Sequence, residues 1–109
     1  MRLFDRLRRK TYHSITITAE FTNSNESYRI ISKLSKYISN MVKDKDSVVT
    51  EYQKFPAGYR MRYYISYTRS FFRRHNYTKE LSNLSDWIYT EDKNDNLLNC
   101  LSKYYYSCS

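Results

Sequence analysis

Two stretches of the sequence, Tyr12–Phe21 and Tyr59–Thr68, alternate their side chains residue by residue, and this pattern constrains the fold more than any other feature. Successive side chains of a β-strand point to opposite faces, so each stretch predicts a strand with one buried and one open face. The buried sides are expected to be His13, Ile15, Ile17, Ala19 and Phe21 in the first stretch and Tyr59, Met61, Tyr63, Ile65 and Tyr67 in the second. Val48–Phe55 also has the character of a strand, and the short turn at residues 56–58 predicts that it forms an antiparallel hairpin with the second stretch.

Apolar residues at helical spacing occupy the segments between and after these strands. They predict a helix over about residues 24–43, capped at Asn23 with Glu26 as the capping-box partner. A second helix is expected to be capped at Thr78. The segment after it fits either a last helix, built on Leu97, Leu98, Leu101 and Tyr105, or a closing strand over residues 103–107. The expected fold is α+β: a small antiparallel sheet of about three strands with helices packed on one face, in the order β-α-β-β-α-α or the ferredoxin-like order β-α-β-β-α-β.

The chain is expected to form one domain. Its 109 residues include one glycine and one proline, which leaves little room for flexible linkers. We place the α+β domain at residues 12–109. Residues 1–11 are expected to form a basic amphipathic N-terminal arm, because Leu3, Phe4 and Leu7 fall at helical spacing among arginines.

The net charge of +8 is concentrated in two segments. Residues 1–10 hold five basic side chains against Asp5, and Tyr52–Lys79 holds seven without a carboxylate. Most of these are arginines, whose planar guanidinium suits bidentate contacts with phosphate. Repulsion between like charges destabilises the folded chain unless a partner neutralises them. We therefore expect an anionic partner.

The spacing of reactive residues does not indicate a catalytic or metal site. His13 and His75 belong to different predicted elements, and His13 is expected to be a hydrogen-bonded structural residue. A single glycine cannot form a phosphate-binding loop. We expect no enzymatic activity, no cofactor, no metal and no small-molecule substrate.

The cysteines and the apolar segments predict a cytoplasmic, reducing location. If Cys100 and Cys108 share one helix, their Cα atoms lie about 12 Å apart, too far for a disulfide, so we expect free thiols. No apolar run approaches the ~20 residues of a membrane span, and residues 1–10 lack the apolar region of a signal peptide.

We expect the open face of the sheet to bind nucleic acid, DNA or RNA, with low sequence specificity, because arginines contact phosphates and tyrosine rings stack on bases. The candidate contacts are Arg60, Arg62, Tyr64, Arg69, Arg73 and Arg74, together with Arg8, Arg9 and Lys10 of the arm. The alternative is a non-enzymatic protein-interaction module, a small inhibitor or adaptor that docks on an acidic protein surface, since Tyr and Arg are enriched at interface hot spots. A third interpretation places the N-terminal arm on an anionic membrane surface. The first two use the same surface, so the sequence leaves both open.

Overall fold

A computed structural model describes residues 10–41, 46–70 and 78–108, with the side chains of residues 69, 70 and 108 left out. The elements follow the order β1 (Lys10–Thr22), α2 (Asn25–Met41), β2 (Ser47–Phe55), β3 (Gly58–Ser70), α3 (Thr78–Glu91) and β4 (Leu97–Cys108). The fold is therefore α+β with the ferredoxin-like order β-α-β-β-α-β, as one of the two predicted orders had it. The sheet has four strands, one more than the expected three.

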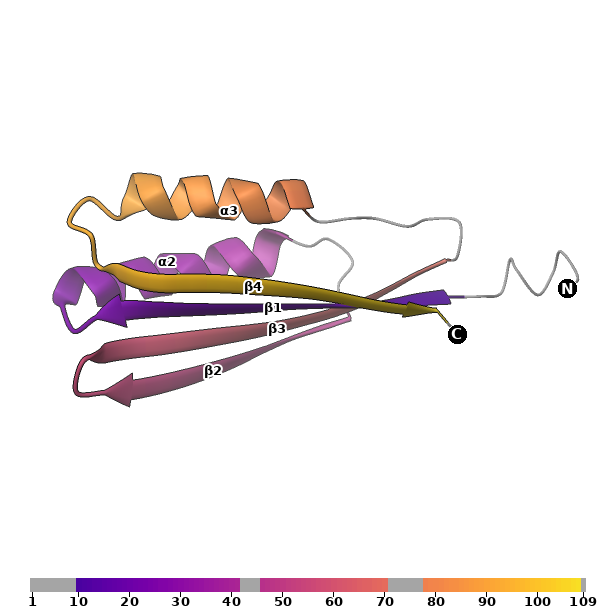
Figure 1. Ribbon diagram of the computed structural model, residues 1–109, viewed down its shortest axis with the longest axis horizontal. Helices are drawn as coiled ribbons and strands as arrows, with labels where there is room; N and C mark the ends of the chain where they lie inside the picture. Colours follow the sequence, from indigo (N-terminus) through magenta and orange to yellow (C-terminus); the bar gives the residue numbers. More distant parts are fainter. Residues whose placement is uncertain (1–9, 42–45, 71–77, 109) are drawn as a thin grey trace, which may run out of the picture.

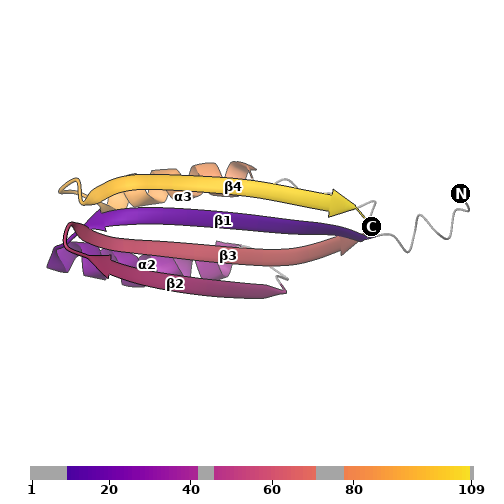
Figure 2. The same ribbon diagram turned by 60° about the horizontal axis from the view of Figure 1, so that its bottom comes forward.

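The four strands form one antiparallel sheet in the order β2-β3-β1-β4. Both helices lie on the same face of this sheet, as Figure 1 shows. The turned view in Figure 2 brings the opposite face forward, and no described element covers it. The sheet thus has a core face under α2 and α3 and an open face.

The core lies between the sheet and the helices, where the alternation predicted it. β1 and β3 contribute the two predicted buried sets, and each of these ten residues is buried. The helices contribute Ile30, Ile31, Leu34 and Ile38 from α2 and Leu84 and Ile88 from α3. Fully burying one such side chain contributes about 1.5–3 kcal/mol. Tyrosines fit this core because their hydroxyls reach partners at its edge: that of Tyr63 lies 3.0 Å from Ser35 Oγ, and that of Tyr59 donates to Asn23 Oδ1.

Helix α2 begins at Asn25, one residue later than predicted from a cap at Asn23. Ser24, and not Asn23, is the capping residue, because its Oγ accepts a hydrogen bond from the backbone N–H of Ser27 at 3.0 Å. Asn23 instead accepts the hydrogen bond from Tyr59. The predicted helix end at residue 43 lies outside the described residues.

The segment 97–108 is a strand along its whole length, so the alternative of a last helix was wrong. The spacing of Leu97, Leu98, Leu101 and Tyr105 fits a helix, but β1 needs a partner for its second edge, and β4 supplies it from Thr11 to Phe21. A bulge between Glu20 and Phe21 absorbs Leu98 and resets the alternation at the start of β4.

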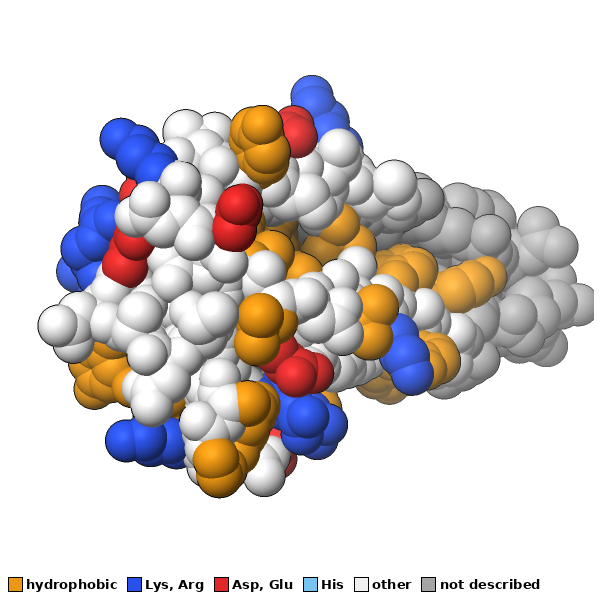
Figure 3. Space-filling view, turned by 60° about the vertical axis from the view of Figure 1, so that its left-hand side comes forward, with side chains coloured by type: hydrophobic (Ala, Val, Ile, Leu, Met, Phe, Trp, Pro, Cys, Tyr) orange, Lys and Arg blue, Asp and Glu red, His pale blue; other side chains and the backbone are white. Residues whose placement is uncertain are grey.

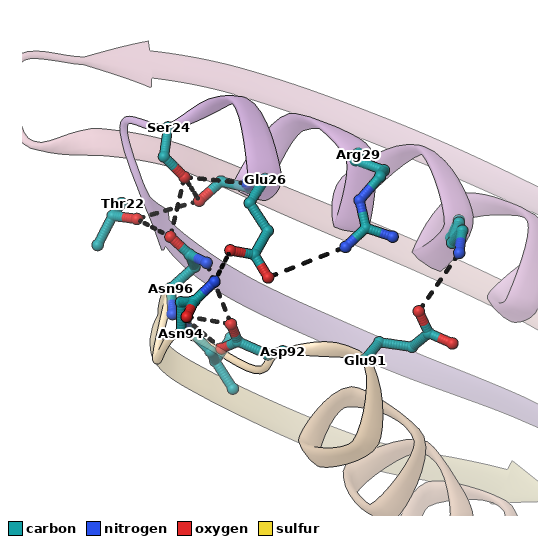
Figure 4. A network of polar contacts seen from close by, with 11 residues as sticks. Thr22, Ser24, Glu26, Arg29, Glu91, Asp92, Asn94 and Asn96 are labelled. Atoms are coloured by element: carbon teal, nitrogen blue, oxygen red, sulfur yellow. Dashed lines mark hydrogen bonds and ion pairs between the residues drawn. The ribbon is translucent and has the colours of Figure 1, made fainter.

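A polar network ties the loop before β4 to the start of α2 (Figure 4). At its centre, the buried side chain of Asn96 accepts hydrogen bonds from the hydroxyls of Thr22 and Ser24, both at 2.8 Å. Asp92 accepts hydrogen bonds from the backbone N–H groups of Asn96 and Leu97. These bonds fix the point at which β4 enters the sheet beside β1.

Candidate functional site

The open face carries side chains from all four strands, because the strand register brings alternate residues into rows. One row runs across Glu51, Arg62, Thr18 and Leu101, and the next across Val49, Tyr64, Thr16 and Lys103. The row beside the first consists of Gln53, Arg60, Glu20 and Asn99. The row beside the second consists of Ser47, Ser66, Ser14 and Tyr105. Tyr12 lies opposite Thr68 on β3 and Ser107 on β4. We call this surface the open face.

Arg60 and Arg62 are both on this face, but their surroundings differ. The Nε of Arg60 lies 3.6 Å from Glu20 Oε1, and its Nη1 donates to Gln53 Oε1 at 3.4 Å. Arg62 lies between Glu51 and Thr18 in the register. Within the described part of the chain, its guanidinium makes neither a hydrogen bond nor an ion pair. Arg62 is therefore the more available of the two cations.

The segment Tyr52–Lys79 contains no carboxylate, but the fold places two carboxylates from other parts of the chain beside it. Glu20 pairs with Arg60, and Glu51 stands opposite Arg62 and accepts a hydrogen bond from the Tyr64 hydroxyl at 3.2 Å. The basic excess of Tyr52–Lys79 is thus partly neutralised by β1 and β2. At the end of the molecule seen in Figure 3, basic and acidic side chains are likewise interspersed. The open face is therefore not uniformly basic, because carboxylates lie next to both of its arginines.

The remaining predicted contacts fall in different places. Lys10 is the first residue of β1 and is exposed. Arg69 belongs to β3, but its side chain is not described. Arg8, Arg9, Arg73 and Arg74 lie outside the described residues, as does the predicted arm up to residue 9. Among the described residues, the fold brings together Arg60, Arg62 and Tyr64.

β4 also contributes to the open face, which the sequence did not predict. Lys103 and Tyr105 both lie on the open face, and Lys103 makes no ion pair among the described residues. Both residues lie within the predicted closing strand over residues 103–107, but the competing helix left this segment without an assigned face. No apolar–polar alternation marks this strand, because the open-face set (Leu101, Lys103 and Tyr105) and the core-face set (Cys100, Ser102 and Tyr104) both mix apolar and polar side chains. The local pattern could therefore not assign Lys103 and Tyr105 to a face.

Two shallow hollows mark the open face. The first, of about 350 Å³, is lined by Glu51, Tyr52, Gln53, Arg60 and Arg62. We call it the arginine hollow. The second, of about 340 Å³, is lined mainly by hydroxyl-bearing residues, and we call it the hydroxyl hollow: Tyr12, Ser14, Ser66, Thr68, Tyr105 and Ser107, with His13, Asp46, Tyr67 and Tyr106.

His13 lies on the core face and is buried and hydrogen-bonded, as expected. Its Nε2 is 2.7 Å from Thr11 Oγ1, and its Nδ1 is 2.6 Å from the Tyr104 hydroxyl. Its ring stacks on Tyr67 with centroids 4.5 Å apart. Both ring nitrogens therefore have partners within the fold.

Cys100 is a free thiol on the core side of β4, and burial raises its pKa above the usual value. Because Cys100 and Cys108 share a strand and not a helix, their backbones are about 26 Å apart, twice the expected separation. In the described residues there is no group of three His, Cys, Asp or Glu side chains that could hold a metal ion. Nor does any described helix have the length and apolar character needed to cross a bilayer.

Neither a family model nor a curated protein matches this chain. Among solved structures, the de novo designed protein Foldit4 is 13% identical over 92% of this chain and 96% of its own, with a TM-score of 0.49. A dabb family protein with a ferredoxin-like fold from Mesorhizobium loti is 13% identical over 90% and 96%, with a TM-score of 0.45. A PII-like signaling protein from Thermus thermophilus is 9% identical over 93% and 90%, with a TM-score of 0.39. Similarity at this sequence identity and TM-score does not indicate a function.

Proposed function

We propose that the open face binds nucleic acid with low sequence specificity. The observation that carries this proposal is the pair of available cations, Arg62 and Lys103, on a face that also exposes tyrosine rings. Arg62 stands on a central strand and Lys103 on an edge strand, with β1 between them. The strand spacing and one row of offset place their Cα atoms about 12 Å apart. A flexible polyanion can reach both.

Low sequence specificity follows from the type of contact. Phosphate contacts position a nucleic acid without reading its bases, and two cations of this kind favour every sequence equally. Glu20 pairs with Arg60, and Glu51 stands opposite Arg62, so each carboxylate weakens the attraction of its neighbouring arginine for phosphate. The effect is larger at Arg60, because its guanidinium is already in contact with Glu20 and Gln53. The proposal therefore assigns the main phosphate contacts to Arg62 and Lys103 and a smaller role to Arg60. It assigns no reaction to this face.

The test is an anisotropy titration of a fluorescein-labelled random-sequence single strand at several salt concentrations. The double variant R62A/K103A is compared with K36A/K93A, which removes the same charge from two exposed lysines on α2 and in the α3–β4 loop. Losing two phosphate contacts should reduce the slope of log affinity against log salt by about 1.4, while the control stays near the wild type. Equal losses in the two double variants would leave only a general charge effect and refute the site.

One observation favours a second candidate, the docking of an acidic protein surface. Val49 and Leu101, 54% and 57% exposed, flank the cations on the same face, and phosphates make no use of aliphatic side chains. Interface cores combine such apolar residues with Tyr and Arg. The absorbance ratio at 260 and 280 nm, before and after a high-salt wash, separates the two candidates. Nucleic acid that co-purifies and is removed by salt supports the first.

A further inference from the structure

The hydroxyl hollow has features that the phosphate contacts do not use. Two tyrosines on adjacent strands contribute to it: Tyr12 faces Ser107 across the β1–β4 pair, and Tyr105 faces Ser14. The two residues are therefore diagonal neighbours, with Cβ atoms about 7 Å apart. Tyr12 is 48% exposed and Tyr105 60% exposed. Both residues line the hollow and are well exposed to solvent.

The chemistry of the lining favours a neutral planar group over a phosphate. The described residues that line the hollow include the acidic side chain Asp46 and neither lysine nor arginine, a lining that does not attract an anion. The hydroxyls of Ser14, Ser66 and Ser107 can each donate or accept, so they fit the mixed donor and acceptor edges of any base. The volume of about 340 Å³ is at the lower end of the range for small-ligand pockets.

The hollow is also within reach of a strand held at the cations. Lys103 and Tyr105 are two residues apart on β4 and on the same face, so their Cα atoms are about 7 Å apart. A phosphate that contacts Lys103 therefore leaves a neighbouring base free to lie over Tyr105. The bases of a duplex are paired and stacked in the helix interior, so none is free to enter the hollow.

From this geometry we propose that the hydroxyl hollow is a stacking site for one unpaired nucleobase, so that the open face binds single strands in preference to duplexes. This inference rests on the proposed function, because it needs the backbone of the same strand to be held by Arg62 and Lys103. It names the ligand class: single-stranded RNA or DNA, with a base stacked on Tyr12 and Tyr105.

The experiment titrates the wild type and three double variants with a labelled single strand and with the same strand annealed to its complement. Y12A/Y105A removes both rings, and Y12F/Y105F keeps them. Y28A/Y89A removes two exposed tyrosines from the helices as a matched control. Far-UV circular dichroism confirms that each variant is folded. A further probe carries abasic residues, which keep the phosphates and lack the bases.

We expect Y12A/Y105A to weaken single-strand binding about 5- to 150-fold, the range measured for losing a stacked base, with duplex binding unchanged. Y12F/Y105F and the helix control should bind like the wild type, and the abasic strand should bind equally to the wild type and Y12A/Y105A. Single-strand affinity within twofold of the wild type in Y12A/Y105A, or wild-type binding that favours duplex, would overturn this inference. If R62A/K103A still weakens binding in that case, the proposed function survives. If R62A/K103A binds like the wild type, the proposed function fails and this inference fails with it.

Discussion

Replacing Asn96 by alanine should destabilise the protein far more than its position in a loop suggests. Its side chain makes three hydrogen bonds: Thr22 and Ser24 donate to its Oδ1 at 2.8 Å, and its Nδ2 donates to Asp92 Oδ1 at 3.2 Å. Asn96 is 6% exposed, so water cannot replace these partners easily. At about 0.5–1.5 kcal/mol for each bond, the variant should lose roughly 2–4 kcal/mol.

The matched control is Asn94→Ala in the same loop. Asn94 is exposed, and its side chain donates one hydrogen bond to Glu26. Its loss should cost less than about 1 kcal/mol, as is usual for an exposed bond. In a chain of this size the two changes translate into a fall in Tm of roughly 10–20 °C for N96A and less than about 5 °C for N94A.

Urea unfolding measures the difference directly. The single tryptophan, Trp87, stacks on Tyr37 with ring centroids 4.8 Å apart, so its fluorescence reports the contact between α3 and α2. Far-UV circular dichroism gives an independent transition, and coincident curves justify a two-state treatment. If N96A lies within about 1 kcal/mol of N94A at an unchanged m-value, the network in Figure 4 does not stabilise the fold as described.

Three further predictions follow from single contacts. Gly58→Ala should cost more than about 1 kcal/mol in urea unfolding, because a Cβ there would lie 1.9 Å from the Phe21 carbonyl oxygen; a cost close to that of Ala57→Gly would contradict the close approach. Glu51→Gln removes the carboxylate opposite Arg62 and should tighten single-strand binding about 1.5- to 5-fold by anisotropy, whereas weaker binding would argue against Arg62 as a phosphate contact. Burial raises the pKa of Tyr63 above 10.0, so the folded state keeps this proton longer than the unfolded state, and stability falls as the pH rises above 10. The free energy of unfolding of Tyr63→Phe should therefore fall less than that of the wild type between pH 9 and 11. Parallel plots of unfolding free energy against pH would show that Tyr63 does not have a raised pKa in the folded state.

The alternation of buried and exposed side chains predicted β1 and β3 well, because the face to which a side chain points is set locally within a strand. In β1 and β3 each side chain's face follows from its neighbours in sequence, and the buried sets were correct residue by residue. β4 was ambiguous for the same reason. Leu97, Leu98 and Leu101 fit a helix locally, and the need of β1 for a second partner is a tertiary effect that no local pattern contains.

The charges were counted along the chain and not across the sheet, so the count did not include the carboxylates that neighbour Arg60 and Arg62. Once the hairpin turn is placed at Pro56 and Ala57, Glu51 must stand opposite Arg62, so this neighbour was predictable. The pair between Glu20 and Arg60 depends on the register of β1 against β3, which joins distant segments. Arg62 thus becomes the more important of the two arginines for the proposed contact, a distinction that composition cannot make.

The central position of β1 has a consequence for how the protein is made. β1 is synthesised before every other described element, yet both of its neighbours, β3 and β4, come much later in the chain. During translation neither edge of β1 has a partner strand until β3 emerges, and the second edge waits for β4. Contacts of such long range slow folding and expose unfinished edges to other chains. A ribosome-bound chain that stops before residue 97 should therefore aggregate through β1, and adding β4 should suppress that aggregation.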